Sequence, residues 1–224
     1  AAPQSSGYRG VHLIYKYVSD RSEQYNGLKI EVQLRSKSQH AWATAVETVG
    51  TFLRQALKSS RGEQEWLRFF ALMGSFLAAQ ERTAYVPSTP TELRELQREI
   101  RALAESLSVA RRLEGYRKAL TVLQDPRAQS DDYFLLKLEP EKEQVTVEGF
   151  RRRRLAVASQ RYLETEKALS GNLVSEVVLV SVDSIGALRK AYPNYFLDTA
   201  NFLQMVRTAC RIQVARSSRR PRKV

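Results

Sequence analysis

The sequence has little of the chemistry from which disulfides and metal centres are built. Its 224 residues include one cysteine and two histidines. The single cysteine, Cys210, cannot form a disulfide within the chain, and one isolated thiol fits a reducing compartment. Two histidines and one cysteine at scattered positions also exclude the usual Cys/His four-ligand zinc site. We therefore expect neither a disulfide framework nor a structural zinc ion.

Long apolar runs, internal repeats and a signal peptide are also missing. No apolar run approaches the ~20 residues that a membrane-spanning helix needs. The hydrophobic content of 43% is ordinary for a globular protein. These features predict a cytoplasmic protein. Because the sequence enters a predicted domain directly after Ala1, we also expect a further segment upstream.

Negative charge is scarce relative to positive charge. The chain has 36 Lys and Arg against 24 Asp and Glu, which gives a net charge of +12 and a pI near 10.0. Such an excess favours a polyanionic partner, either nucleic acid or a membrane surface, because phosphate contacts release counterions. A solvated basic surface with a charged tail explains the excess equally well. Charge alone leaves both explanations open.

Residue periodicity predicts a hairpin followed by helices in the first half. Two alternating segments, 11–18 and 28–35, predict an antiparallel strand pair that turns at the Asn-Gly of "YNG". Apolar spacing of three and four then predicts helices over 38–58, 63–83, 92–107 and 109–124. Thr91 is the predicted N-cap of the third helix.

The second half has a different composition and predicts a ββαβα unit. The strands are expected over 133–140, 143–150 and 176–182. A helix over 151–171 should end at Gly171 as its C-cap, and helical segments should cover 184–192 and 196–214. The predicted fold class is α+β. The predicted boundary near 125–132 separates a unit over 1–125 from a unit over 131–213, with a basic tail over 214–224.

The second predicted strand carries an unusual polar face. Alternation places Lys29, Glu31, Gln33 and Arg35 together on one side. An exposed face with ion pairs is one interpretation. The other is a phosphate and metal site, in which Glu31 holds Mg²⁺ or accepts a proton from a hydroxyl group and Arg35 neutralises phosphate oxygens.

Two linked motifs favour the second interpretation. "GYRGVHLIYKY" followed by "IEVQLRSKSQHAWA" resembles the second half of the RelA/SpoT nucleotidyltransferase-like synthetase domain, over residues 6–47. The order is the same: a Gly-Tyr-Arg loop, a strand with a histidine, a Glu-Val-Gln-Leu-Arg strand, and a helix with a Trp-Ala pair. The chain departs from the family at "TAVET", where Glu-His is common. The family's ATP-binding Arg and Lys, and the Asp that shares Mg²⁺, lie upstream of the loop and are not in this chain.

The resemblance implies roles for individual residues. Glu31 matches the catalytic glutamate, which coordinates Mg²⁺ and activates the acceptor hydroxyl. Tyr8 matches the tyrosine that stacks on the acceptor base, although a loop tyrosine that packs on its own hairpin is the alternative. Arg35 is a predicted phosphate contact. The implied acceptor-binding set is Tyr8, His12, Gln33, Arg35 and His40. For the two histidines a structural hydrogen bond is the alternative, and Trp42 and Ala43 are predicted packing residues.

The C-terminal part resembles the corresponding domain of CapRel-type fused toxin–antitoxins. Those proteins join a RelA/SpoT-like toxic synthetase to a pseudo-zinc-finger domain without metal ligands. Their Tyr-x-x-Tyr motif occupies the site of the ATP adenine and keeps the enzyme inactive until a phage capsid protein binds. In this chain "AYPNYFLD" supplies the motif as Tyr192 and Tyr195.

The implied activity is pyrophosphate transfer from ATP, with Mg²⁺, to the 3′-hydroxyl of the tRNA CCA end. The alternative enzyme is a (p)ppGpp synthetase that uses GDP or GTP. A third possibility, from another class, is an inactive fragment that binds nucleic acid or a partner. The basic candidates for tRNA contacts are Arg111, Arg112, Arg117, Lys118, Arg151, Arg152, Arg153 and Arg154. Each of these also fits an ordinary solvated surface.

Overall fold

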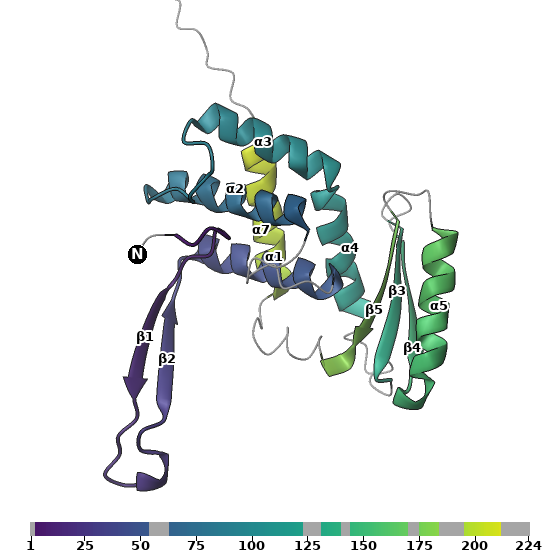
Figure 1. Ribbon diagram of the computed structural model, residues 1–224, viewed down its shortest axis with the longest axis horizontal. Coiled ribbons are helices and arrows are strands. Elements are labelled where there is room, and N and C mark those ends of the chain that lie inside the picture. The colour runs from purple at the N-terminus through teal and green to yellow at the C-terminus, as the bar shows by residue number, and fades with distance from the viewer. Residues whose placement is uncertain are drawn as a thin grey trace, which may run out of the picture.

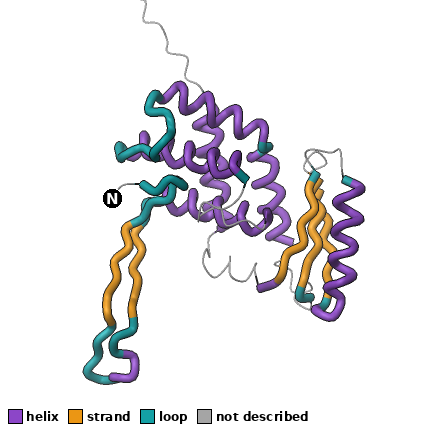
Figure 2. Tube along the Cα trace, in the orientation of Figure 1, coloured by secondary structure: helices purple, strands orange, loops and turns teal. Residues whose placement is uncertain are grey.

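The fold is mixed α+β, with helices and two small antiparallel sheets, in agreement with the predicted class (Figures 1 and 2). The computed structural model describes residues 3–53, 63–122, 131–139, 144–169, 175–183 and 195–211. The predicted helical segment 184–192 and the basic tail lie outside these residues. None of the described helices is both long and apolar enough to cross a membrane.

A two-stranded hairpin projects from the helices (Figure 1). Strands β1 (Val11–Lys16) and β2 (Lys29–Leu34) pair antiparallel, which confirms the predicted pair. The chain does turn at Asn26-Gly27, where the backbone N of Leu28 donates to the Tyr25 carbonyl at 3.2 Å, but this is not the type I′ turn that an Asn-Gly pair favours in a hairpin. Gly27 has a positive φ of 86°, but Asn26 has φ −61°, whereas a type I′ turn needs positive φ at both positions. Residues 17–28 form a longer connection with a 3-10 turn, η1 (Glu23–Tyr25).

The hairpin has one apolar and one mainly polar face, and both are exposed. The register places three apolar pairs on one face. Their side chains are between 38% and 54% exposed. These residues are Val11, Leu13, Tyr15, Ile30, Val32 and Leu34. The other face carries the His12–Gln33, Ile14–Glu31 and Lys16–Lys29 pairs.

Four helices follow the hairpin, close to their predicted positions. They are α1 (Lys37–Leu53), α2 (Gln64–Glu81), α3 (Leu93–Ser106) and α4 (Val109–Val122). The predicted N-cap at Thr91 is wrong. Glu92 has the extended cap conformation, and its carboxylate accepts a hydrogen bond from the backbone N of Arg94.

A capping box turns the end of β2 directly into α1. Ser36 Oγ accepts from the backbone N of Gln39 at 3.1 Å, and Gln39 Oε1 accepts from the backbone N of Ser36 at 3.1 Å. Glu81, at the end of α2, accepts from the Ser36 hydroxyl at 2.5 Å and from Gln39 Nε2 at 3.0 Å. The base of the hairpin is thereby joined to two helices.

The second sheet has the order β4-β3-β5 and is antiparallel throughout. Its strands are β3 (Tyr133–Glu139), β4 (Gln144–Phe150) and β5 (Glu176–Ser181), as predicted within one or two residues. A 3-10 turn, η5 (Arg152–Arg154), precedes α5 (Leu155–Ala168). The prediction that Gly171 caps this helix is wrong, since the C-cap is Leu169.

One hydrophobic cluster joins the helices to the sheet. Phe134, Leu136 and Leu138 of β3 belong to this cluster, whereas Leu135 packs in a second cluster with Ala158 of α5. Figure 1 shows α5 on the side of the sheet away from the helices. One hydrophobic cluster therefore contains residues from both sides of the predicted boundary.

The last helix, α7 (Tyr195–Cys210), packs on α1, α2, α3 and α4 rather than on the sheet. Its Phe202 side chain is fully buried in the main cluster. The predicted division into 1–125 and 131–213 stays a prediction, but α7 lies with the helices of the first part.

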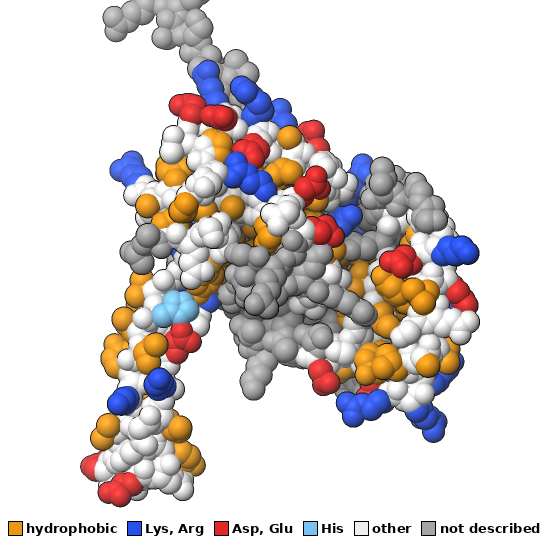
Figure 3. All heavy atoms as spheres, viewed as in Figure 1, with side chains coloured by type: hydrophobic (Ala, Val, Ile, Leu, Met, Phe, Trp, Pro, Cys, Tyr) orange, Lys and Arg blue, Asp and Glu red, His pale blue; other side chains and the backbone are white. Residues whose placement is uncertain are grey.

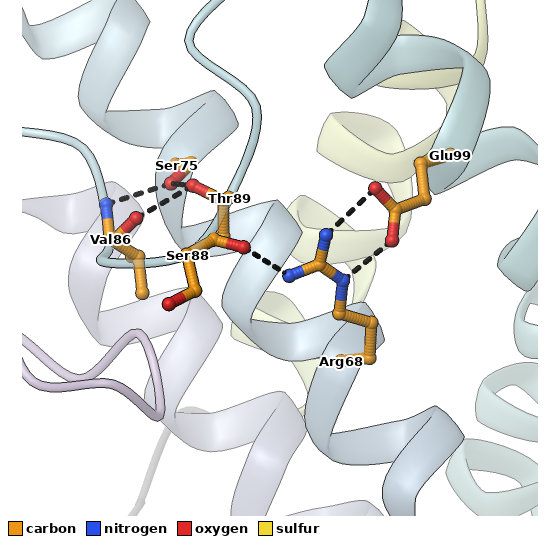
Figure 4. A network of polar contacts seen from close by, with 6 residues as sticks. All are labelled: Arg68, Ser75, Val86, Ser88, Thr89 and Glu99. Atoms are coloured by element: carbon orange, nitrogen blue, oxygen red, sulfur yellow. Dashed lines mark hydrogen bonds and ion pairs between the residues drawn. The ribbon is translucent and has the colours of Figure 1, made fainter.

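A polar network fixes the loop between α2 and α3 (Figure 4). Arg68 donates to both carboxylate oxygens of Glu99 at 2.5 and 2.9 Å, and to the Ser88 carbonyl at 2.6 Å. Ser75 Oγ accepts from the backbone N of Val86 at 2.8 Å and lies 2.5 Å from Thr89 Oγ1. The loop is thus held on the helix that also supports the hairpin base.

Candidate functional site

Four side chains predicted to act together are joined by hydrogen bonds at the base of the hairpin. Arg35 Nη2 donates to the Tyr8 hydroxyl at 2.8 Å. That hydroxyl lies 2.7 Å from His12 Nε2, and His12 Nδ1 bonds Glu31 Oε1. A guanidinium group only donates, so the Tyr8 O–H is free to donate to Nε2. The Nδ1–H of His12 then donates to the carboxylate. Arg35 Nε is buried and makes no hydrogen bond within the described part of the chain.

Gln33 completes this cluster. Its Oε1 accepts from Arg35 Nη2 at 2.5 Å. A hydrogen bond from His12, and then one from Gln33, holds the pKa of the Glu31 carboxyl below its usual 4.5. Arg35 adds an attractive charge of smaller effect, and its guanidinium lies 5.2 Å from the centre of the Tyr8 ring. Both its solvent exposure and these contacts favour the ionised form of Glu31 at neutral pH.

A hollow of about 500 Å³ lies beside the cluster, between the loop, the hairpin and the end of α2. Tyr8, Arg9, His12 and Gln39 are among its lining residues. Arg9 donates to Thr83 Oγ1 at 2.6 Å and to the Gly74 carbonyl at 3.0 Å. Burial lowers the pKa of Arg9, and the charge of Glu81 partly opposes this. The hollow is therefore lined by the aromatic ring of Tyr8, the imidazole of His12 and the guanidinium group of Arg9, which two hydrogen bonds hold in place.

The described residues supply only part of a metal site. They contain no group of three or more His, Cys, Asp or Glu side chains that could hold a metal ion. Glu31 alone offers a carboxylate at the hairpin cluster. Mg²⁺ commonly takes one or two protein carboxylates and completes its shell with water and substrate phosphates. Glu31 therefore fits one ligand position, and phosphate oxygens and water would have to fill the others.

His40 lies apart from this cluster. It projects from α1 toward α7, where its Nε2 is 3.2 Å from Oδ2 of the nearly buried Asp198. This contact fits the structural alternative, and the acceptor-binding role of His40 stays a prediction. Trp42 and Ala43 are buried packing residues, as predicted.

The basic residues predicted on one helix do not form a uniformly exposed face. Arg111 is exposed on α4, whereas Arg112, Arg117 and Lys118 are half-buried. Arg117 donates to both carboxylate oxygens of Glu114, at 2.5 and 3.2 Å. This pair raises the pKa of Arg117 and lowers the pKa of Glu114.

The other basic group is exposed at the turn between β4 and α5. Arg151, Arg152, Arg153 and Arg154 are all exposed, and Arg154 lies 5.7 Å from the centre of the Phe150 ring. The sequence pattern predicts that all four arginines lie in a helix. In the structure Arg151 is extended, and the three arginines after it form the 3-10 turn. The backbone N of Arg152 donates instead to Asp132 Oδ2. In Figure 1 this turn and the hairpin lie on opposite sides of the helices.

The predicted Tyr-x-x-Tyr motif spans the edge of the described residues. Tyr192 lies outside them, and Tyr195 is the first residue of α7. Asp198, one turn later, contacts His40 in the first turn of α1. Gln39, beside His40, lines the hollow. The beginning of α7 therefore lies at the end of α1 that carries the hairpin.

Sequence reasoning did not single out the residues that support the site. Arg9 follows Tyr8 directly, but its contacts with Thr83 and Gly74 are long-range and leave no local signal. Ser36 and Gln39 do have a signal, because Ser-x-x-Gln before an apolar run is a capping-box pattern.

Comparison with known proteins adds one partial match. No family model matches the chain. A protein described as threonine–tRNA ligase, from Nitrosopumilus maritimus (strain SCM1), is 34% identical over 87 residues. The match covers 38% of this chain and 14% of that protein. The chain thus spans a small fraction of the curated relative that it matches, and this likeness does not show a family.

Proposed function

We propose that this chain carries the acceptor side of a RelA/SpoT-type pyrophosphokinase, with the tRNA CCA end as acceptor. The observation that carries the proposal is the cluster of Tyr8, His12, Glu31 and Arg35 beside a hollow. The resemblance at the sequence level implies these residues for acceptor binding and catalysis. The geometry supports it because residues from the loop and both strands meet.

Each side chain has a task in the proposed reaction. The acceptor base enters the hollow beside Tyr8, and Arg35 exchanges its contact with the Tyr8 hydroxyl for a phosphate oxygen. Glu31, ionised and oriented by His12, faces the ribose 3′-hydroxyl, accepts its proton and offers one ligand position to Mg²⁺. The hydroxyl oxygen attacks the β-phosphorus of ATP in line, and AMP leaves. The protein contributes positioning and charge neutralisation.

The donor side of the reaction is not among the residues of this chain. In the resembled family, the ATP-binding residues lie upstream of the Gly-Tyr-Arg loop. The exposed apolar face of the hairpin offers a surface on which such a segment would pack. We infer that transfer requires donor-side residues of that kind together with the hairpin cluster.

The preference for tRNA over a free guanine nucleotide has two supports. The net charge of +12 suits a long polyanion better than a mononucleotide. The partial match to a protein described as a tRNA ligase points in the same direction, within its 87 residues. The alternative, a (p)ppGpp synthetase that uses GDP or GTP, shares every residue of the hairpin cluster. An inactive binding fragment remains the alternative of another class.

A labelling experiment tests the proposal. The complete product of the reading frame is incubated with ATP labelled in its β- and γ-phosphates, with tRNA or with GDP, with and without Mg²⁺. We expect label on tRNA, and its loss in Glu31→Gln. Label only on GDP would support the alternative enzyme. No label on either acceptor would overturn both enzyme proposals.

We also propose that the Tyr-x-x-Tyr segment restrains the enzyme until a partner, such as a phage capsid protein, binds it. The position of α7 supports this, because its first turn contacts the end of α1 next to the hollow. Replacing both Tyr192 and Tyr195 with Ala should make the complete protein toxic without a trigger. Normal growth of cells that express the double variant would contradict it.

A further inference from the structure

Two lysines face each other on the polar side of the hairpin. Lys16 of β1 lies directly opposite Lys29 of β2 in the strand register. Like charges in directly opposed positions destabilise a strand pair. The hairpin therefore holds an unfavourable pair at the outer end of its two strands.

Neither ammonium group is neutralised by a neighbour. Both lysines are exposed, and within the described part of the chain neither has an ion pair or a hydrogen bond from its side chain. The carboxylate closest along the strand is Glu31, two residues or about 7 Å from Lys29. That carboxylate is already bonded to His12, and a second hydrogen bond comes from Gln33. The two positive charges are thus available to a ligand.

The lysines lie on the same face as the hairpin cluster. From the base outward, the cross-strand pairs on this face are His12–Gln33, Ile14–Glu31 and Lys16–Lys29. Figure 3 shows a histidine, a carboxylate and two basic side chains following one another along the hairpin. The first and last pairs are four residues apart, about 13 Å along the strands. This is the scale of a nucleotide that extends from its base to its terminal phosphate.

Protection of exposed strand edges is the other common reason for lysines on a hairpin. That role does not explain their arrangement here. The two lysines occupy one register pair on the polar face, and the three apolar pairs on the opposite face are exposed. The positive charge of the two lysines instead extends the polar face outward from Glu31.

We propose that Lys16 and Lys29 form a binding site for a phosphate chain of a ligand held by the hairpin cluster. The inference rests on the proposed function, because it assigns the lysines to a substrate of that same site. The phosphate chain belongs either to a nucleoside polyphosphate or to the backbone of the RNA acceptor. Both sources present closely spaced negative oxygens to two ammonium groups.

Binding measurements on this chain test the proposal without requiring catalysis. The variants are Lys16→Gln, Lys29→Gln and the double change, and the ligands are tripolyphosphate, ATP and a single-stranded RNA that ends in CCA. Lys37→Gln is the matched control, because Lys37 is also an exposed lysine and lies near the hairpin base. We expect the double variant to lose about tenfold or more in affinity at low salt, and the control to change less than about twofold.

The three ligands separate the two sources. A loss confined to tripolyphosphate and ATP assigns the lysines to a nucleoside polyphosphate. A loss for RNA, with a salt dependence reduced by about two counterions, assigns them to the acceptor backbone. Equal affinities of wild-type and double variant for all three ligands would overturn the proposal, as would an equal loss in Lys37→Gln.

A structural measurement guards against simple unfolding. Amide hydrogen exchange of β1 and β2 should be as slow in the double glutamine variant as in wild type, or slower, because the repulsion is removed. The double change to Arg should retain binding. Faster exchange together with lost binding, not restored by Arg, would assign the lysines a structural role and overturn the proposal.

The outcome is independent of the labelling experiment. If the complete protein transfers label and the double variant still binds all three ligands, only the assignment of the lysines fails. If no acceptor is labelled but the lysines still bind tripolyphosphate, the proposed function fails and the phosphate site stands.

Discussion

Arg35 donates a hydrogen bond to the hydroxyl of Tyr8 at 2.8 Å, and thereby joins the end of β2 to the loop that precedes β1. The same hydroxyl bonds His12, so one oxygen atom connects the loop to both strands. Tyr8 is only 8% exposed, because its ring packs into the edge of the main core. This residue positions the site and also contributes to the fold.

Replacing Tyr8 with Phe should therefore reduce stability as well as acceptor binding. The change keeps the ring and removes two hydrogen bonds at a nearly buried position. We expect the free energy of unfolding to fall by about 1–2 kcal/mol. Urea denaturation measures this. Tyr25→Phe is the control, because Tyr25 is 51% exposed and should change stability by less than about 0.5 kcal/mol. Equal stabilities of the two variants would show that the Tyr8 hydroxyl has no structural role.

The ionisation of Glu31 should make the order of the hairpin depend on pH. The pKa of this group is lowered in the folded protein, chiefly by the hydrogen bond from His12. A lowered pKa means that the stabilising contact is fully present above 4.5 and is lost as the pH falls through the lower folded value. The protection of amides in β1 and β2 against exchange, relative to amides in the helices, should therefore fall as the pH is lowered below 4.5.

The control for this experiment is Glu31→Gln, which cannot titrate. Its hairpin should show a smaller loss of protection over the same pH range. The same loss of protection in wild type and Glu31→Gln would assign the effect to other carboxylates, such as Glu114, whose pKa is also lowered.

Much of this hairpin could be predicted from the sequence, because strict alternation fixes which residues share a face. The assignment of Glu31 and Gln33 to one side of β2, with Arg35 continuing the pattern one residue after it, needs only that rule. The turn could not be predicted in the same way. An Asn-Gly pair favours a two-residue turn, but the neighbouring 3-10 turn at Glu23–Tyr25 lengthens the connection and leaves Asn26 with negative φ.

Long-range contacts account for the remaining differences between the predicted and the observed structure. The position of His40 depends on Asp198, which is 158 residues away along the chain, and no local pattern links the two. The same is true of α7, whose apolar stripe would fit the sheet or the helices equally well. Its observed place is decided by the packing of Phe202 and Val206 in the main cluster. Periodicity predicts that a face is buried, but it does not predict which element covers it.

The contribution of the ion pair between Arg68 and Glu99 to the stability of the fold should come more from its geometry than from its charge. Two guanidinium nitrogens of Arg68 contact the carboxylate, and a third donates to the Ser88 carbonyl. Both side chains are about a third exposed, so solvent screening limits the contribution to about 1 kcal/mol. Arg68→Lys should recover less than half of the stability lost in Arg68→Ala, because an ammonium group cannot make the paired contact.

Thermal denaturation of these two variants checks this prediction. Arg98→Ala is the control on α3, since Arg98 is exposed and is not part of the network. Full recovery of stability in Arg68→Lys would show that charge alone accounts for the contribution.

Replacement of glycine by alanine should change the stability of the protein in opposite directions at two helical positions. A Cβ at Gly74 of α2 would lie 3.0 Å from Gly7 Cα and 3.1 Å from the Gly7 carbonyl oxygen, both backbone atoms that cannot rotate away. A Cβ at Gly115 of α4 would meet only Leu138 Cδ2, at an ordinary 3.8 Å. Alanine gains about 0.5–1 kcal/mol over glycine inside a helix when space permits.

We therefore expect Gly115→Ala to stabilise the protein by up to about 1 kcal/mol, and Gly74→Ala to destabilise it by about 1–3 kcal/mol. The clash at Gly74 also has a consequence for the site. Gly7 directly precedes Tyr8, so a shift of Gly7 away from an alanine at position 74 would also move Tyr8. Gly74→Ala should thus weaken binding of the CCA-ending RNA, whereas Gly115→Ala should not. If Gly74→Ala proves as stable as Gly115→Ala and binds RNA normally, the loop does not depend on its close contact with α2.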